Sequence, residues 1–359
     1  MLPEVVNLNL DPTRRVTSKD VAERAGVSRT TVSLVLNRIP NTNISQETIE
    51  RVFKAADDLG YVPNAAAQSL VRRNAGVVGL VLTRRNHTLA TDAFFFQLVE
   101  GLLDALRPHR LRLMVDVIEE EDPHSYLRLA RSHQVDGILL SGPRYDDGAL
   151  EALALRRFPV VVMGSLAGIP FDSVDVDNTA SARLAVQHLI RLGHQRIGCI
   201  TNAPLSFTAA KDRLDGYCQA LEEAGLPYNE RWVGEGAFDP QSGYEQMDRI
   251  LQIEQKPDAM FVASDVVAFG ALSALARCGL RVPQQMAVVG FDDVPMAAYS
   301  LPPLTTIHLP TRGLAQVAGE RLVQMLQGQS PEARRILLET NLVVRQSCGG
   351  KTSEFEING

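Results

Sequence analysis

The sequence predicts an α/β protein with a small helical unit at its N-terminus, followed by two lobes of parallel β-sheet flanked by helices. Three observations predict this fold class. Residues 16–62 carry apolar side chains at helical spacing, and beyond Ala75 short apolar runs alternate with helical stretches. The chain also has 359 residues, 45% of them hydrophobic and 22% charged, which exceeds one typical domain and suits a globular protein of two or three domains.

Charge is unevenly distributed along the chain. The formal net charge is −6, yet residues 1–74 hold ten Lys and Arg against eight Asp and Glu. A mildly basic head on an acidic body fits a nucleic-acid contact confined to one end. Residues 1–15 contain two prolines and no helical period, so we expect them to form a loose arm.

The most informative segment is residues 16–37, VTSKDVAERAGVSRTTVSLVLN, which predicts two short helices joined by a turn at Gly26. Glycine permits such a turn because it has no Cβ. The hydroxyls of Thr17 or Ser18 and of Ser28 are placed to cap the two helices. A plain surface hairpin is the alternative to a DNA-reading unit. The polar face of the second helix suits base edges and phosphates, and it carries Arg29, Thr30, Ser33 and Asn37.

A third helix is expected over residues 44–59, where apolar side chains recur every three or four residues. Ser45 marks its start. Tyr61 to Asn64 are expected to end it, because the residue before Pro63 is pushed out of helical space. Residues 64–73 form a short Ala-rich run without an obvious core to pack against. A helix of this length is marginal in water, so the residues alone favour a plain linker.

The rest of the chain is expected to form two parallel sheets, divided near Asp175. Strands are predicted at residues 77–82, 111–117, 137–140, 160–163, 173–176, 196–200, 259–262 and 287–291, and helices at 95–106, 179–192, 214–223 and 266–278. Residues 305–310 and 337–344 are expected to cross back between the lobes.

Ligands gather beyond the carboxyl ends of the strands in open α/β sheets. Carboxylates, a guanidinium and flat aromatic faces follow the predicted strands here. They suit a small polyol, because charged groups bind hydroxyls and rings cover the C–H face of a sugar. The candidate effector-binding residues are Asp92, Phe94, Phe95, Ser141, Arg213, Phe238, Asp265 and Asp292.

Each candidate has a structural alternative. The phenylalanines suit a hydrophobic core, and Arg213 suits an ion pair between the lobes. Asp265 and Asp292 suit the starts of the helices that follow them, where Asp is a common cap. Asp293, next in sequence, is expected to hold its loop.

No arrangement of residues predicts catalysis. The chain has no nucleophile elbow, phosphate-binding loop or metal-spaced histidine cluster, so we expect no enzyme activity, no metal and no cofactor. A carbohydrate-modifying enzyme would need a paired acid and base, for which Asp265 with Asp292 is the one candidate. The absence of a signal peptide or membrane span predicts a cytoplasmic protein with reduced thiols at Cys199, Cys218, Cys278 and Cys348.

Four blocks of the N-terminal segment follow the order and spacing of a known family: KDVAERAGVS (19–28), TTVSLVLN (30–37), ISQETIERVFKAADDLGYVPN (44–64) and AAAQSL (65–70). Further blocks in the body are DVDN (175–178), LGHQRIG (192–198), RLDGY (213–217), SDVVAFGAL (264–272), VVGFDDVP (288–295) and PPLTTI (302–307). With these blocks the sequence resembles the LacI/GalR family of transcriptional regulators over about residues 16–346.

The resemblance implies how the chain is organised. Residues 16–62 would form a helix-turn-helix headpiece, and residues 63–74 a hinge that becomes helical on operator DNA and inserts Leu70 between base steps in the minor groove. Residues 75–346 would form a core like that of periplasmic binding proteins, with the effector between two lobes joined by three crossovers. Lobe 1 would span about 75–175 and 305–335, lobe 2 about 176–304 and 336–346, and the tail 347–359.

The implied function is that of a ligand-responsive transcriptional regulator, most commonly a repressor, that binds a near-palindromic operator as a homodimer. A solute-binding transport component shares such a core, but it would carry a signal peptide and no headpiece. The tail has no leucine heptad, so we expect a dimer without a tetramerising coiled coil. The implied DNA contacts are Thr17, Ser28, Arg29, Thr30, Thr31, Ser33, Leu34, Asn37, Asn64, Ala67 and Leu70.

Departures from the commonest family pattern concern the operator and the ligand. The family often has Arg where this chain has Leu34, which removes a bidentate contact to guanine, so we expect the operator to differ at that base. Gly164, Ser165 and Leu309 replace polar residues common in sugar-binding relatives, and Asp92 replaces an Asn. A neutral sugar or polyol is the expected effector, with a nucleoside or an aromatic-bearing molecule as the alternative. Induction and corepression both stay open.

Overall fold

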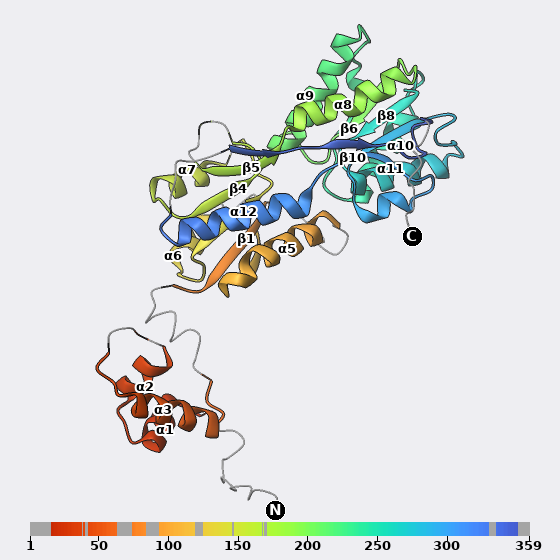
Figure 1. The fold of residues 1–359 in the computed structure, drawn as a ribbon. Coiled ribbons are helices and arrows are strands. Elements are labelled where there is room, and N and C mark those ends of the chain that lie inside the picture. Colours follow the sequence, from red (N-terminus) through yellow and green to blue (C-terminus); the bar gives the residue numbers. More distant parts are fainter. Residues whose placement is uncertain are drawn as a thin grey trace, which may run out of the picture. The chain divides into compact units, whose positions relative to one another are not determined.

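The computed structural model describes residues 16–37, 39, 42–62, 74–83, 93–118, 125–145, 147–166, 168, 171–329 and 335–350. The chain forms two compact units, Met1–Ala75 and Gly76–Gly359, each with its own hydrophobic core (Figure 1). The expected arm, most of the expected hinge, Asp92 and the end of the tail lie outside the described residues.

The described part of the N-terminal unit consists of α1 (Ser18–Ala25), α2 (Arg29–Leu36) and α3 (Gln46–Asp58). Apolar side chains from all three helices meet in a small core around Val21, Val32, Val35 and Val52. The two helices predicted from residues 16–37 are present, and Gly26 between them has a φ of +65°. Because so small a core is marginal, local bonds at the helix ends contribute an important share of the stability.

Hydrogen bonds fix the starts of these helices. The carboxylate of Asp20 accepts both the backbone N–H and the hydroxyl of Thr17, each at 2.7 Å. The Oγ of Ser28 accepts the N–H of Thr31 at 3.0 Å, as the sequence predicts for a cap. Ser45 caps α3 in the same way.

α3 ends within one residue of the expected position, but Pro63 is not the cause. The helix ends at Asp58, with Leu59 as its cap. Gly60 adopts a φ of +61°, and the N–H of Tyr61 donates to the carbonyl of Ala56 at 2.8 Å. A left-handed glycine that closes the last turn therefore terminates the helix before the proline acts.

The first lobe of the larger unit contains a parallel sheet with the strand order β11-β5-β4-β3-β1-β2. Its strands are β1 (Val77–Thr83), β2 (Arg112–Ile118), β3 (Gly137–Ser141), β4 (Val160–Met163), β5 (Asp172–Val176) and β11 (Arg335–Leu338). α5 (Ala93–Leu106) and α12 (Thr311–Leu326) pack together on one face (Figure 1). α6 (Ser125–Arg131) and α7 (Gly148–Leu155) pack on the other. Leu80 and Leu82 lie in the cluster with α5, and Val81 in the cluster with α7, as the period of a strand requires.

The second lobe contains a sheet with the order β12-β10-β9-β8-β6-β7, in which β12 runs antiparallel to β10. Its strands are β6 (Ile197–Ile200), β7 (Val233–Gly234), β8 (Ala259–Val262), β9 (Ala287–Asp292), β10 (Thr305–His308) and β12 (Asn341–Val343). α8 (Asn178–Arg191) and α9 (Thr208–Glu223) pack on one face, and α10 (Pro240–Leu251) and α11 (Asp265–Arg277) on the other. Short 3-10 turns are η2 (Arg107–His109), η3 (Glu230–Trp232) and η4 (Pro295–Ala298).

Within the described residues the chain passes between the lobes from β5 to α8, from β10 to α12 and from β11 to β12. Two lobe boundaries differ from the expectation. β10 pairs with β9 and belongs to the second lobe, although residues from 305 were assigned to the first. β11 pairs with β5 and belongs to the first lobe, although residues from 336 were assigned to the second. An apolar run does not identify its distant pairing partner, which explains both errors.

Candidate functional site

The polar face of α2 is the candidate DNA-reading surface. Arg29 and Thr30 are exposed, and Ser33, Leu34 and Asn37 are half-buried. The side-chain amide of Asn37 donates to the Oγ of Ser33 at 3.2 Å, which orients this pair. Leu34 is not among the described apolar side chains that pack on the headpiece core, so its surface remains open to a partner.

Charge favours Arg29 as the leading cation of this surface. Lys19, Arg24 and Arg51 each lie within 4 Å of a carboxylate oxygen, on Glu23, Asp58 and Glu47 respectively. Arg29 has no carboxylate partner among the residues that the structure describes. A guanidinium that is not already paired can bind a phosphate or a guanine edge.

The remaining predicted DNA contacts fall into two groups. Thr17, Ser28 and Thr31 lie at the starts of α1 and α2, where their hydroxyls take part in capping; the Oγ of Ser28 and the Oγ1 of Thr31 are 2.9 Å apart. Asn64, Ala67 and Leu70 lie outside the described residues.

A pocket lies between the two lobes of the larger unit, beyond the carboxyl ends of several strands. It encloses about 850 Å³ of empty space, its open mouth included. Five of the predicted effector-binding residues line it: Phe94, Ser141, Arg213, Phe238 and Asp292. Phe95 and Asp265 do not line it, and Asp92 lies outside the described residues.

Arg213 is held by protein contacts on three sides. Its Nε donates to the Oδ1 of Asn178 at 2.9 Å, and its Nη1 donates to the carbonyl of Ala263 at 2.7 Å and to the Oδ1 of Asp292 at 3.4 Å. The guanidinium carbon lies 3.6 Å from the centroid of the Phe291 ring. Burial lowers the pKa of Arg213, and the neighbouring carboxylate of Asp292 acts in the opposite direction. These contacts fix the guanidinium and leave Nη2 without a protein partner in the described chain.

Two pocket residues have backbone conformations that L-amino acids rarely adopt. Asp292 has a φ of +112° and Phe238 a φ of +62°. Each such conformation costs roughly 1–3 kcal/mol, and such residues cluster at ligand sites. Asp292 lines the pocket from the end of β9, and Phe238 lines it from the loop before α10.

Aromatic rings form a second feature of the pocket. The rings of Phe207 and Phe238 meet edge to face, with centroids 5.0 Å apart, and Phe94 lines the pocket from α5 of the first lobe. Leu309 and Met163 add apolar surface. Leu309, one of the departures from the commonest family pattern, therefore lies in the pocket wall, where a bound ligand would meet it.

The structure also places in the wall polar residues that were not among the candidates. Asp175 is the penultimate residue of β5, Asn178 begins α8, Asn202 follows β6 and Ser264 precedes α11. All four lie at strand ends or in the loops after them, so the rule that selected the other candidates applies to them too. Ser264 rather than its neighbour Asp265 reaches the pocket.

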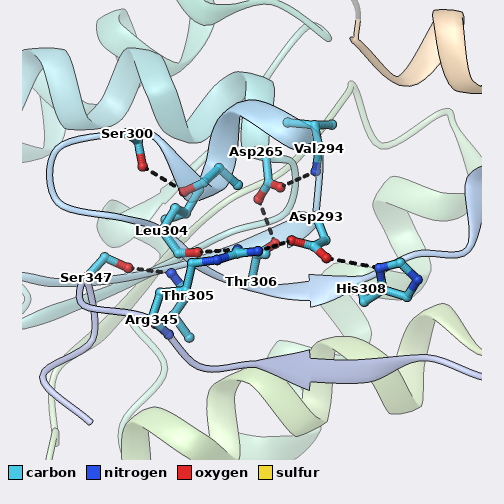
Figure 2. A network of polar contacts seen from close by, with 11 residues as sticks. Asp265, Asp293, Val294, Ser300, Leu304, Thr305, Thr306, His308, Arg345 and Ser347 are labelled. Carbon is cyan, nitrogen blue, oxygen red and sulfur yellow. Dashed lines mark hydrogen bonds and ion pairs between the residues drawn. The ribbon is translucent and has the colours of Figure 1, made fainter. Parts of the chain in front are cut away.

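Asp265 has a different role from the one expected. It is fully buried; its Oδ1 accepts the hydroxyl of Thr306 at 2.7 Å, and its Oδ2 accepts the N–H of Val294 at 3.0 Å (Figure 2). Burial, followed by the charge of Asp292, raises the pKa of Asp265. The carboxylate braces the loop after β9 against β10 instead of lining the pocket or capping α11.

Phe95 is likewise a core residue. It is buried in the cluster of the first lobe and meets the ring of Phe96 edge to face, with centroids 5.4 Å apart. Consecutive residues of a helix point about 100° apart, so Phe94 and Phe95 face different surroundings.

Asp293 holds its loop, as expected. Its Oδ1 lies 2.7 Å from Nη2 of Arg345, and its Oδ2 lies 3.0 Å from Nδ1 of His308 (Figure 2). Arg345 follows β12 and His308 ends β10. The ion pair with Arg345 and the contact with His308 therefore attach the loop that presents Asp292 to two neighbouring strands.

Backbone hydrogen bonds join the lobes beside the pocket. The N–H of Tyr145, in the loop after β3, donates to the carbonyl of Ser206, in the loop after β6, at 3.0 Å. The N–H of Thr208 donates back to the carbonyl of Pro143 at 3.1 Å. Between these bonds, the guanidinium of Arg144 lies 5.7 Å from the centroid of the Phe207 ring. The structure thus shows the two lobes in contact along one side of the pocket.

Comparison with known proteins identifies the family. One family profile, "Bacterial regulatory proteins, lacI family", matches residues 17–64, and a second, "Periplasmic binding protein-like domain", matches residues 186–348. The HTH-type transcriptional regulator CelR of Thermobifida fusca is 38% identical over 341 residues, which cover 93% of this chain and 98% of CelR. The chain belongs to the lacI family.

Other lacI-family relatives agree. The HTH-type transcriptional repressor PurR of Edwardsiella ictaluri is 36% identical over 92% of this chain and 96% of PurR. Among solved structures, the CelR–cellobiose complex matches with a TM-score of 0.70 and 36% identity, over 93% of this chain and 100% of CelR. The lac repressor dimer bound to operator and the anti-inducer ONPF matches with a TM-score of 0.79 and 31% identity, over 93% of this chain and 99% of that one.

As a lacI-family member, the chain is a DNA-binding transcriptional regulator with a ligand-binding core, and its relatives are regulators rather than enzymes. Of the helices that the structure describes, none has the length and apolar character needed to cross a membrane.

Proposed function

We propose that this regulator represses transcription by binding a near-palindromic operator as a homodimer, and that a sugar or polyol in the interlobe pocket changes its affinity for DNA. The observation that carries the proposal is the ion pair of Arg213 and Asp292 in a pocket that also contains the rings of Phe94 and Phe238. Sugars need both kinds of surface, because they have hydroxyl edges and apolar C–H faces.

Cellobiose is the first effector to test. CelR, which is 36% identical in the structural comparison, was solved as a complex with cellobiose. The polar groups of this pocket, among them Ser141, Arg213 and Asp292, offer both donors and acceptors to hydroxyls.

A nucleoside or another aromatic-bearing molecule is the second candidate. The edge-to-face pair of Phe207 and Phe238 and the apolar side chains of Met163 and Leu309 favour a flat, weakly polar ring. This chemistry would make the effector less polar than a simple hexose.

On DNA, we place α2 in the major groove, with Arg29 and Thr30 as the principal readers and Leu34 beside a thymine methyl. The hinge residues Asn64, Ala67 and Leu70, outside the described residues, are proposed to enter the minor groove as a pair of helices. The regulator would act in the cytoplasm. Ligand that closes the lobes would change the spacing of the two hinges and so favour one DNA-binding state.

A homodimer is supported by exposed apolar side chains. Phe96 and Leu103 on α5, and Val115 and Val117 on β2, are each more than a third exposed, and α5 and β2 are neighbours in the first lobe. Exposed apolar side chains gathered on neighbouring elements are typical of an interface. Sedimentation of the full chain is expected to give a dimer, and a persistent monomer or a stable tetramer would contradict this assembly.

A thermal-shift screen of sugars, polyols and nucleosides tests the effector class, because a ligand of the folded state raises its melting temperature by mass action. Cellobiose is expected to stabilise the protein and to change its affinity for operator DNA in a gel-shift assay. Asp292→Asn should reduce the stabilisation. A shift with nucleosides alone would overturn the sugar proposal in favour of the second candidate.

A further inference from the structure

Asp175 presents an unused acceptor to the pocket. The residue lines the pocket from the end of β5, in the first lobe, and is 8% exposed. Its Oδ1 accepts the N–H of Val176 at 2.8 Å and the side-chain amide of Asn178 at 3.1 Å. Its Oδ2 has no hydrogen-bond partner among the described residues. Two bonds to one oxygen thus fix the carboxylate and leave the other oxygen for a ligand.

Asn178 connects this carboxylate to the charged pair of the second lobe. Its amide nitrogen donates to Asp175, and its Oδ1 accepts from Nε of Arg213, which also pairs with Asp292. The three charged groups in the pocket wall therefore stand in one chain of hydrogen bonds. The positive charge of Arg213 is already matched by Asp292, so Asp175 leaves the wall with an excess of negative charge.

The wider surroundings do not cancel that excess. Asp212 of α9 adds a second negative charge near Asp175, and the positive charges of Arg335 and Lys211 act on Asp212. Arg213 is the cation that acts on Asp175 itself. On the same strand, Asp172 is paired with Arg321 of α12, and Arg335 stands on the neighbouring strand β11. Burial raises the pKa of Asp175 to about 6, although the N–H of Val176, Arg213 and Asn178 act against the rise.

Asn202 is an independent observation that points to a polar ligand. It lines the pocket from the loop after β6, in the second lobe, and is 6% exposed. Its Oδ1 is buried and has no hydrogen-bond partner within the part of the chain that the structure describes. A buried polar atom without a partner costs about 1–3 kcal/mol, so such atoms call for a specific explanation. A ligand hydroxyl would satisfy it.

We propose that Asp175 is a specificity-determining residue, which accepts a hydrogen bond from a hydroxyl of an uncharged effector and excludes phosphorylated and other anionic ligands. This inference rests on the proposed sugar effector and restricts that effector to uncharged sugars and polyols. Asp175 belongs to the first lobe, whereas Arg213, Asp292 and Asn202 belong to the second. A ligand that binds both sets ties the lobes together.

Calorimetric titration of the full chain tests the assignment with two matched probes, cellobiose and cellobiose 6′-phosphate. The wild type is expected to prefer cellobiose by about tenfold or more, because a buried carboxylate repels the phosphate. Asp175→Asn keeps an acceptor for Val176 and Asn178 but turns the free oxygen into a donor. The variant should bind cellobiose about tenfold more weakly than the wild type does. Its preference for cellobiose over cellobiose 6′-phosphate should also be smaller.

Asp177→Asn is the matched control. It removes a negative charge two residues away, at an exposed position where the carboxylate caps α8 through the N–H of Ala180, and Asn caps equally well. The control should bind both probes as the wild type does. Equal affinities of wild type and Asp175→Asn for cellobiose, or a wild-type preference for the phosphate, would overturn the inference.

Thermal unfolding without ligand separates the proposed role of Asp175 from the proposed sugar effector. The folded-state pKa of Asp175 lies above its unfolded value, so the stability that the group contributes at low pH is lost as pH rises from about 4 through 6. Asp175→Asn should therefore melt higher than the wild type at pH 8, and the gain should shrink at pH 5. A lower melting temperature of equal size at both values would show a structural role and overturn the inference. Failure of both sugars to bind the wild type, with this pH pattern present, would instead reject the sugar effector.

Discussion

Asp265 and Asp292 are buried carboxylates at the same edge of the second sheet, and their partners give them different roles. Both oxygens of Asp265 are used by Thr306 and Val294. Asp292 lines the pocket and pairs with Arg213. The first carboxylate thus stabilises the loop that carries the second, and a strained backbone at Asp292 is maintained by that support.

Gly290→Ala should damage this support. A Cβ at residue 290 would lie 2.2 Å from Oδ1 of Asp265 and 2.9 Å from a side-chain carbon of Leu304. We expect a loss of about 2 kcal/mol or more in unfolding free energy, measured by urea denaturation. Gly148→Ala is the control, because a Cβ there meets nothing within 4 Å. Equal stability of the two variants would argue against the packing at Gly290.

Leu34→Arg should change the operator. The half-buried leucine offers only apolar contact, whereas arginine can bind guanine bidentately, which is worth about 1–3 kcal/mol of discrimination. Selection from a randomised operator library is expected to show a new guanine preference at one base of each half-site. Leu34→Met should retain the wild-type sequence. An unchanged motif for the arginine variant would remove Leu34 from the reading surface.

At the scale of elements, the loops after β3 and β6 determine how the lobes meet. Pro143 lines the pocket and accepts the N–H of Thr208 across the lobes. Gly164, after β4, lies against Pro143. The position of one loop in the first lobe therefore controls a hydrogen bond to the second.

Gly164→Ala should disturb that contact. Its φ is +133°, and an added Cβ would lie 2.6 Å from the ring of Pro143. We expect the displaced loop to weaken the interlobe bonds and to raise the Kd for cellobiose about tenfold, measured by calorimetry below the melting transition. Gly148→Ala should leave the Kd unchanged. A variant with reduced melting temperature but an unaltered Kd would show that the contact serves stability alone.

Local signals and distant pairings differ in how well the sequence predicts them. The caps at Ser28 and Ser45 and most of the strands, such as β1 and β8, follow from residues close in sequence, so the sequence predicts them. β7 has two residues, too few to show a period. The lobe assignment of β10 and β11 depends on pairing with distant strands. In the site, the positions after the predicted strands indicate Arg213 and Asp292. Asp265 stands at the start of a helix, and the sequence has no pattern that shows in which direction its side chain points. Its absence from the pocket lining could therefore not be predicted.

At the scale of the whole molecule, the effector and the operator DNA must change each other's binding affinity to the same extent. If cellobiose changes operator affinity by a given factor, operator DNA must change cellobiose affinity by the same factor, because the two are linked through one set of states. Calorimetric titration of cellobiose with and without operator, beside operator titration with and without cellobiose, checks this. Unequal factors would mean that the sugar acts through a second site or a change of assembly.

The three crossings between the lobes also set the order in which the protein can be completed during synthesis. The headpiece helices end at Asp58, so they are made first, and they share a core of their own. The first lobe needs α12 to cover α5 and β11 to pair with β5, and both are made after most of the second lobe. A nascent chain that stops before α12 is therefore expected to carry a finished DNA-binding head on an unfinished lobe, whose exposed apolar face marks it for degradation.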